Sequence, residues 1–272
     1  MKLFLCDARS NQKALAHKIH AKFKIDGIIV VNQKVKKLKR TNFKLSLKRI
    51  SNFIGFLLTF GQFRKAWFGM LSYYEKNFSE FPIKPLIEVH DINQIEVEKI
   101  ILTFKPELVL VSGTNILQQK LLNIINQYGV IMNLHTGISP YIKGGPDCTF
   151  WCLYLKEFDL IGNTIMWIDS GIDSGNIIST EQTKLNGDES LLDLKIKNMN
   201  HGHSLYLRAI ELFLNKKILP NVSQSFFKPQ RLFLSKNWGL KEQFLAYYNF
   251  SRYFNKRCIQ NTLHKLVDLN SR

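Results

Sequence analysis

Residues 107–135, ELVLVSGTNILQQKLLNIINQYGVIMNLH, contain the pattern that decides the fold. Two short apolar runs, 107–113 and 130–135, flank a segment with helical spacing at 116–127. Short apolar runs of this kind are typical of strands in a sheet that is covered on both faces. A strand, a helix and a second strand in this order predict a parallel βαβ unit.

The same alternation runs through most of the chain. It predicts an α/β fold with a mostly parallel sheet flanked by helices. Parallel strands place ligand sites at their carboxyl ends, where loops and helix N-termini converge. The other predicted strands are KLFLC (2–6), DGIIVV (26–31), IKPLIEV (83–89) and NTIMWI (163–168), and the other predicted helices lie in 12–23, 92–104 and 188–214.

A length of 272 residues allows one large α/β domain and a small appendage. We expect the domain to span 1–220, with a helical basic insertion at about 34–80. A C-terminal extension of one hairpin and a helix is expected at 221–272. Four cysteines are too few for a disulfide framework, and the N-terminal segment lacks the features of a signal peptide, so a cytoplasmic location is expected.

The net charge of +17 is concentrated in KVKKLKRTNFKLSLKR (34–49), which has eight basic and no acidic residues. Such a run is compatible with a solvated face, and also with attraction to a phosphorylated substrate, anionic lipid or RNA. The apolar segment 50–63 is shorter than the ~20 residues that span a bilayer, so it predicts a buried or interfacial helix.

Two polar motifs follow predicted strands. NLHTGISPYIKGGPD (133–147) places Asn133 and His135 at a strand end, before a loop rich in Gly and Pro. GNTIMWIDSGIDSGNII (162–178) places Asp169 and Asp173 in a tight turn, with glycines where the backbone bends or a ligand approaches. Alone, each motif is also compatible with an ordinary structural role, such as a hairpin turn.

Together, the Asn-Leu-His, Ser-Pro and Lys-Gly steps of the first motif and the Asp-Ser-Gly-Ile-Asp turn of the second resemble the formyltransferase family. This family includes methionyl-tRNA formyltransferase, glycinamide ribonucleotide transformylase and the sugar N-formyltransferases of surface-polysaccharide pathways. The resemblance covers 105–185 well and the first hundred residues more loosely. It implies a Rossmann-like domain that uses 10-formyltetrahydrofolate.

The resemblance implies catalytic roles for Asn133, His135 and Asp173. An amide N–H and an imidazolium are suitable donors for a formyl oxygen that becomes negatively charged when an amine attacks. A carboxylate beside the imidazole favours its charged form and can accept the proton that the amine sheds. Neither a metal nor a covalent enzyme intermediate is required.

For folate, the resemblance points to the loop after 107–113 and to the Asp169 turn. The candidate folate-binding residues are Gly113, Ile116, Leu117, Asp169 and Ile172. The apolar members are equally compatible with a plain core. Cys148 and Cys152 are expected to be buried structural thiols, because a zinc site requires closer paired spacing and further ligands.

Three acceptor amines remain open. A nucleotide-linked amino sugar for lipopolysaccharide or O-antigen synthesis fits best. A methionyl-tRNA formyltransferase would be expected to carry a C-terminal β-barrel, for which the residues after Pro220 are too few. For glycinamide ribonucleotide, the stretch ARSNQKAL (8–15) resembles a phosphate-holding loop but lacks its glycines. The candidate acceptor-binding residues are Arg9, Ser10, Asn11, Lys143 and Gly144, although Ser10 is also suited to capping a helix.

The basic, aromatic segment from 34 to 74 offers further contacts. Its Trp67, Tyr73 or Tyr74 could stack on the acceptor's base. The alternative of another class is a non-catalytic protein on this scaffold that docks on a membrane surface. The oligomeric state stays open, with a homodimer among the alternatives.

Overall fold

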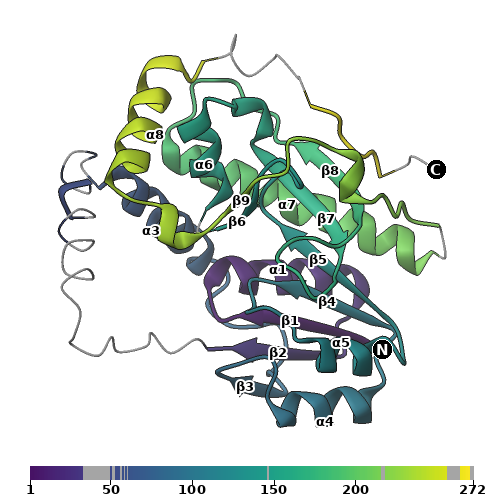
Figure 1. Ribbon diagram of the computed structural model, residues 1–272. Helices are drawn as coiled ribbons and strands as arrows, with labels where there is room; N and C mark the ends of the chain where they lie inside the picture. The colour runs from purple at the N-terminus through teal and green to yellow at the C-terminus, as the bar shows by residue number, and fades with distance from the viewer. Residues whose placement is uncertain are drawn as a thin grey trace.

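A computed structural model of the protein describes residues 1–32, 50, 53–55, 57, 59, 61–145, 147–215, 218–255 and 264–269. The basic run 34–49 of the predicted insertion lies outside the described residues, as does Cys258. A seven-stranded sheet with the order β3-β2-β1-β4-β5-β7-β8 forms the centre of the molecule (Figure 1).

The sheet is mostly parallel, as predicted. Its parallel strands are β1 (Lys2–Asp7), β2 (Gly27–Val31), β3 (Ile87–Val89), β4 (Leu108–Ser112) and β5 (Val130–His135). β7 (Gly162–Trp167) pairs antiparallel with β5 and with β8 (Ile177–Gln182). Because β7 starts beside the end of β5, with Thr164 opposite His135, the two polar motifs lie close together.

Helices cover both faces of the sheet (Figure 1). In β1, Phe4 and Cys6 pack toward α1 and α7, whereas Leu3 and Leu5 pack toward α4 and α5, as the alternation of side chains along a strand requires. The helices are α1 (Ser10–Phe23), α3 (Gln62–Glu75), α4 (Ile95–Phe104), α5 (Gln119–Ile125), α6 (Cys148–Leu155), α7 (Leu191–Leu214) and α8 (Leu240–Tyr253).

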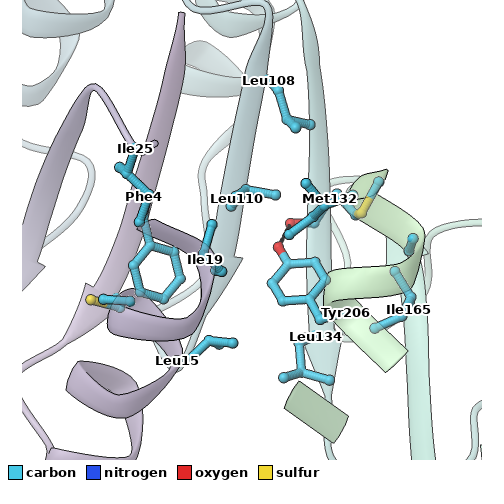
Figure 2. Packing of buried hydrophobic residues seen from close by; sticks show 14 of the residues in the cluster. Phe4, Leu15, Ile19, Ile25, Leu108, Leu110, Met132, Leu134, Ile165 and Tyr206 are labelled. Atoms are coloured by element: carbon cyan, nitrogen blue, oxygen red, sulfur yellow. Dashed lines mark hydrogen bonds between the residues drawn. The ribbon is translucent and has the colours of Figure 1, made fainter. Parts of the chain in front are cut away.

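Tyr206 connects α7 to the centre of the sheet. Its buried hydroxyl donates to the Met132 carbonyl at 2.6 Å and accepts from the Val111 amide at 3.0 Å. Figure 2 shows this ring among the apolar side chains between the sheet and the two helices α1 and α7. One side chain therefore bridges β4, β5 and α7, just before β5 reaches His135.

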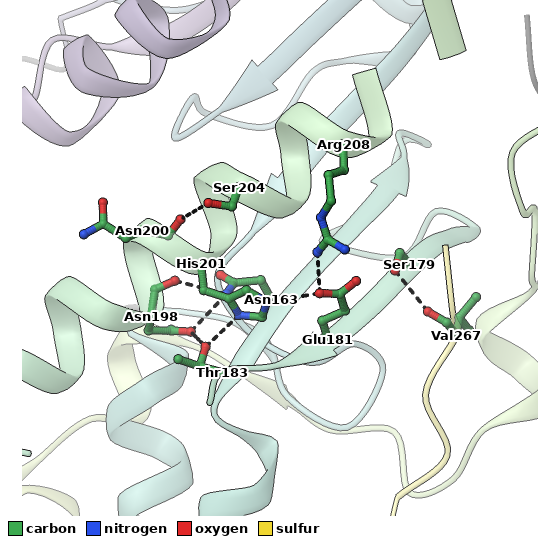
Figure 3. A network of polar contacts seen from close by, with 10 residues as sticks. All are labelled: Asn163, Ser179, Glu181, Thr183, Asn198, Asn200, His201, Ser204, Arg208 and Val267. Atoms are coloured by element: carbon green, nitrogen blue, oxygen red, sulfur yellow. Dashed lines mark hydrogen bonds and ion pairs between the residues drawn. The ribbon is translucent and has the colours of Figure 1, made fainter. Parts of the chain in front are cut away.

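A buried polar network joins β7 to α7 (Figure 3). The Asn163 amide donates to the Asn198 carbonyl and to Asn198 Oδ1, both at 3.0 Å. The Thr183 hydroxyl donates to the same Oδ1 at 2.6 Å. The segment 188–214, predicted as one or two helices, contains the single helix α7, which the Ser190 hydroxyl caps by accepting from the Asp193 amide.

The C-terminal segment packs against the rest of the chain. Its helix is α8, which packs on α6. The prediction of a hairpin is wrong: β9 (Leu232–Phe233) pairs in parallel with β6 (Lys143–Gly144) in the loop after β5. The ring of Phe233 stacks on the ring of Trp151 in α6, with the two ring centres 4.3 Å apart. This contact favours pairing of β9 with the distant strand β6 over pairing with a neighbouring segment.

Candidate active site

His135 ends β5 and is buried. Its Nδ1 lies 3.3 Å from Asp173 Oδ2, and its Nε2 lies 3.2 Å from the Ile142 carbonyl oxygen. A carbonyl oxygen only accepts hydrogen bonds, so Nε2 carries a hydrogen. Nδ1 faces the carboxylate of Asp173.

Asp173 is held from two directions. Its Oδ2 accepts from the Gly144 amide at 2.9 Å, which links it to the loop after β5. The side-chain amide of Gln224, in the C-terminal segment, donates to the carbonyls of Asp173 and Gly175 at 2.8 and 2.7 Å. Asp173 itself has φ of 47°, a conformation that costs free energy for a residue other than glycine. Such a conformation persists only where surrounding contacts hold the residue in it.

The loop after His135 is packed tightly against the imidazole. The Thr164 hydroxyl donates to the Gly137 carbonyl at 2.6 Å and accepts from the Ser139 amide at 2.9 Å. A Cβ at Gly137 would lie 2.7 Å from His135 Nε2, so this position requires glycine. Cys148 Sγ lies 3.5 Å from the same nitrogen. Burial, with the negative charge of Asp173, raises the pKa of Cys148, which therefore stays a thiol.

Two cavities meet at these residues. The larger cavity, of about 450 Å³, has walls from the β4–α5 loop, the end of β7 and the turn 168–175. The smaller cavity, of about 350 Å³, has walls from the start of α1, from α3, α6 and α7, and from the end of β5. Thr114, Asn133, Gly144 and Asp173 line both cavities, and His135 lines the smaller one.

No protein-family model matches the chain. Its sequence is similar to methionyl-tRNA formyltransferase of Clostridium perfringens, with 24% identity over 182 residues that cover 62% of this chain and 58% of that protein. The chain therefore spans less than two thirds of the length of this curated relative. Methionyl-tRNA formyltransferase of Carboxydothermus hydrogenoformans is 32% identical over 130 residues, which cover 47% of this chain and 41% of that protein.

Formyltransferases are also among the solved structures with the same fold. A sugar N-formyltransferase from a Shewanella species has a TM-score of 0.55 and 12% identity, covering 92% of this chain and 87% of that one. The N-formyltransferase of Helicobacter canadensis, in complex with folinic acid and dTDP-3-aminofucose, has a TM-score of 0.55 and 17% identity. The match covers 91% of this chain and 80% of that one. The chain resembles the formyltransferases in sequence and in fold. Phosphoribosylglycinamide formyltransferase of Anaplasma phagocytophilum is a further fold neighbour, with a TM-score of 0.53 and 16% identity over 86% of this chain and 98% of that one.

The residues that the formyltransferase resemblance assigns to folate fall around the larger cavity, with one exception. Ile116, Leu117, Asp169 and Ile172 line it. Ile116 and Ile172 are 50% and 36% exposed, so they are not plain core. Gly113 lines the smaller cavity instead, with φ of 74°, and a Cβ there would lie 2.8 Å from the Gln12 side chain.

The residues that the formyltransferase resemblance assigns to the acceptor are divided. Arg9 and Asn11 line the smaller cavity, and Gly144 lines both. Ser10 and Lys143 line neither, and the Ser10 hydroxyl donates to the Leu71 carbonyl at 2.6 Å.

Of the three aromatic residues expected to stack on a base, the structure places one at a cavity. Trp67 lines the smaller cavity. Tyr74 cannot stack on a ligand, because it is buried and donates from its hydroxyl to Asn200 Oδ1 at 3.0 Å. Tyr73 is 45% exposed and lines neither cavity.

A buried ion pair in the smaller cavity was not predicted. Lys195 Nζ lies 2.8 Å from Asp147 Oδ2, with the two side chains 2% and 7% exposed. Lys195 also lies 5.4 Å from the centre of the Trp67 ring, and the Arg9 guanidinium lies 5.3 Å from it. The available signal was a lysine among the buried, mostly apolar positions of α7, next to Leu194.

In the part of the chain that the structure describes, no three His, Cys, Asp or Glu side chains come together in a way that could hold a metal ion. Among the helices of that part, none has the length and apolar character needed to cross a bilayer. Cys148 and Cys152 are both buried free thiols, as predicted.

Proposed function

We propose that the protein transfers a formyl group from 10-formyltetrahydrofolate to a primary amine. The observation that carries this proposal is the position of Asn133, His135 and Asp173 where the two cavities meet. Each cavity can take one substrate, so that the formyl carbon and the amine nitrogen meet beside these three side chains. Holding two reactants in such an orientation is itself a large part of catalysis.

The larger cavity fits the folate. Its volume lies within the roughly 300–1,000 Å³ of small-molecule sites. Ile116 and Ile172 expose apolar surface that a pteridine ring would cover, and the turn 168–175 adds backbone polar groups. The folinic acid bound by the Helicobacter canadensis relative supports this assignment. 10-Formyltetrahydrofolate supplies an electrophilic formyl carbon when bound.

Each member of the trio has a distinct role. The Asn133 amide donates a hydrogen bond to the formyl oxygen as it becomes negatively charged, and His135 Nε2 exchanges the Ile142 carbonyl for the same oxygen. Asp173 faces His135 Nδ1 and accepts, directly or through water, the proton that the attacking amine loses. Loss of one donor of this kind commonly lowers kcat by about 10²–10³-fold.

The acceptor that we propose is a nucleotide-linked amino sugar, for the synthesis of a surface polysaccharide such as an O-antigen, in the cytoplasm. Sugar N-formyltransferases match the fold over about nine tenths of the chain, and one of them binds dTDP-3-aminofucose. The smaller cavity, with Trp67 in its wall, can take the sugar. Initiator tRNA is the second candidate, because the sequence relatives are methionyl-tRNA formyltransferases.

The test is an acceptor panel with 10-formyltetrahydrofolate: dTDP- and UDP-linked amino sugars, initiator tRNA and glycinamide ribonucleotide. We expect formylated amino sugar as the product, and its loss in His135→Ala. Product with tRNA alone would refute the sugar acceptor. Transfer by His135→Ala at a near wild-type rate would show that the site is assigned wrongly. A protein that formylates no acceptor would favour the non-catalytic alternative.

A further inference from the structure

Two residues that line the smaller cavity carry buried hydrogen-bond acceptors that have no donor. Asn11 is 2% exposed and Gln12 is 6% exposed, and both lie in the first turn of α1. Asn11 Oδ1 and Gln12 Oε1 accept no hydrogen bond from any described residue. Leaving such a group unsatisfied costs about 1–3 kcal/mol, so two of them in one wall indicate a place for donors from a ligand.

Asp147 adds a carboxylate to the same wall. Lys195 Nζ lies 2.8 Å from its Oδ2 and neutralises its charge, but neither carboxylate oxygen accepts a well-formed hydrogen bond within the described part of the chain. The lysine therefore holds the carboxylate in place while its oxygens keep unused acceptor sites. Three residues that line one cavity, two in α1 and one directly before α6, thus carry acceptors without a donor.

The cationic side chains of this cavity are already paired. Arg9 Nε donates to Asp7 Oδ2 at 2.6 Å, and Lys195 faces Asp147. A phosphate binds to donors and cations, whereas this wall offers acceptors and paired cations. Hydroxyl groups are donors, and Trp67 gives the same cavity an aromatic wall against which a sugar ring can lie.

We propose that Asn11, Gln12 and Asp147 bind the hydroxyl groups of the acceptor, so that the ring carrying the reactive amine is a polyhydroxylated sugar and no phosphate lies beside it. This inference rests on the proposed function for its setting and extends it by naming the residues that select the acceptor. Lys195 is a positioning residue, which acts on the ligand through Asp147.

The decisive variants are Asn11→Leu and Gln12→Met, which keep the side-chain size and remove the acceptor oxygen. Each is expected to raise the KM for the amino sugar about tenfold, the effect of one lost hydrogen bond, and to leave the KM for the folate within about twofold. Circular dichroism confirms that each variant folds.

The matched control is Asn249→Leu. Asn249 is also buried, at 4% exposure, but its amide donates to the carbonyls of Leu153 and Tyr154 and it lines neither cavity. Its loss is expected to lower the thermal midpoint and to leave both KM values unchanged. A rise in the sugar KM in this control as large as that in Asn11→Leu would overturn the inference.

Binding without turnover separates this inference from the proposed function. Calorimetry on the His135→Ala protein measures the affinity for dTDP- and UDP-linked amino sugars, and adding Asn11→Leu to it is expected to weaken binding about tenfold. Wild-type activity on amino sugars with no effect of Asn11→Leu or Gln12→Met would overturn the inference and keep the function. If the wild-type protein binds the sugar in a way that depends on Asn11 but forms no product, the proposed function is overturned and the inference is kept. Binding of inorganic phosphate that depends on Asn11, or no sugar binding at all, would also overturn the inference.

Discussion

Replacing Gln224 with methionine is expected to slow formyl transfer in a protein that still folds. The side-chain amide of Gln224 donates to the carbonyls of Asp173 and Gly175, at 2.8 and 2.7 Å, and is the contact through which the C-terminal segment fixes the catalytic turn. Methionine has nearly the same length and no donor. The variant therefore leaves every member of the trio in the chain and removes only the support of Asp173.

The expected size follows from the two lost hydrogen bonds. Each neutral bond stabilises the turn by about 1 kcal/mol, so the position of Asp173 that pairs with His135 loses about 2 kcal/mol relative to other conformations. If the whole loss appears in the barrier, kcat falls about 30-fold. Gln224→Glu places a carboxylate against two carbonyl oxygens and is expected to be at least as damaging.

The assay is steady-state formyl transfer by wild type, Gln224→Met, Asp173→Asn and the double variant. Because Gln224 acts through Asp173, the methionine change is expected to add less than about threefold to the loss in Asp173→Asn. Ser225→Ala, in the same turn, is the control, since its hydroxyl contacts only Ser223 among the described residues. A kcat for Gln224→Met within twofold of wild type, or effects that multiply fully in the double variant, would refute this reasoning.

Three further predictions concern stability, measured by urea unfolding. Tyr206→Phe is expected to lower the free energy of unfolding by about 1–3 kcal/mol, because the Met132 carbonyl loses its buried donor; a change below 0.5 kcal/mol would contradict this. Burial raises the pKa of Glu189, but hydrogen bonds from Lys197 and backbone amides outweigh burial and lower it to about 2. Its stabilisation, about 3 kcal/mol, is therefore present above pH 4.5 and is lost as the pH falls toward 2, and Glu189→Gln is expected to remove this pH dependence. Ser190→Ala removes the N-cap of α7 and is expected to cost about 1 kcal/mol, whereas Ser204→Ala, inside the same helix, serves as the control.

The sheet and the closeness of His135 and Asp173 could be predicted because the motifs that carry them are local. Each parallel strand is a short apolar run beside an amphipathic helix, and both polar motifs follow such strands directly. The structure brings His135 and Asp173 within 3.3 Å, although 38 positions separate them, because β7 pairs antiparallel with β5. The resemblance to formyltransferases groups the same two residues in one site.

The supports of the site could not be predicted in the same way. Gln224 lies 51 positions from Asp173, and the segment around it has no periodic pattern that shows where it packs. Lys195 of α7 and Asp147, directly before α6, are joined only in the folded chain, so each looks like an ordinary surface charge in the sequence. Trp67 and Tyr74 stand on one helix, and only its tilt against α1 and α7 decides which of them reaches a cavity.

The wall that the two cavities share has a consequence for reaction order. Thr114, Asn133, Gly144 and Asp173 face both cavities, so neither substrate has to leave before the other enters. No side chain is needed to store the formyl group between two half-reactions. For the proposed transfer, a ternary complex must therefore form, and double-reciprocal plots at several folate concentrations are expected to intersect. Parallel lines would indicate that the formyl group is bound covalently to the enzyme between two half-reactions, and would contradict this expectation.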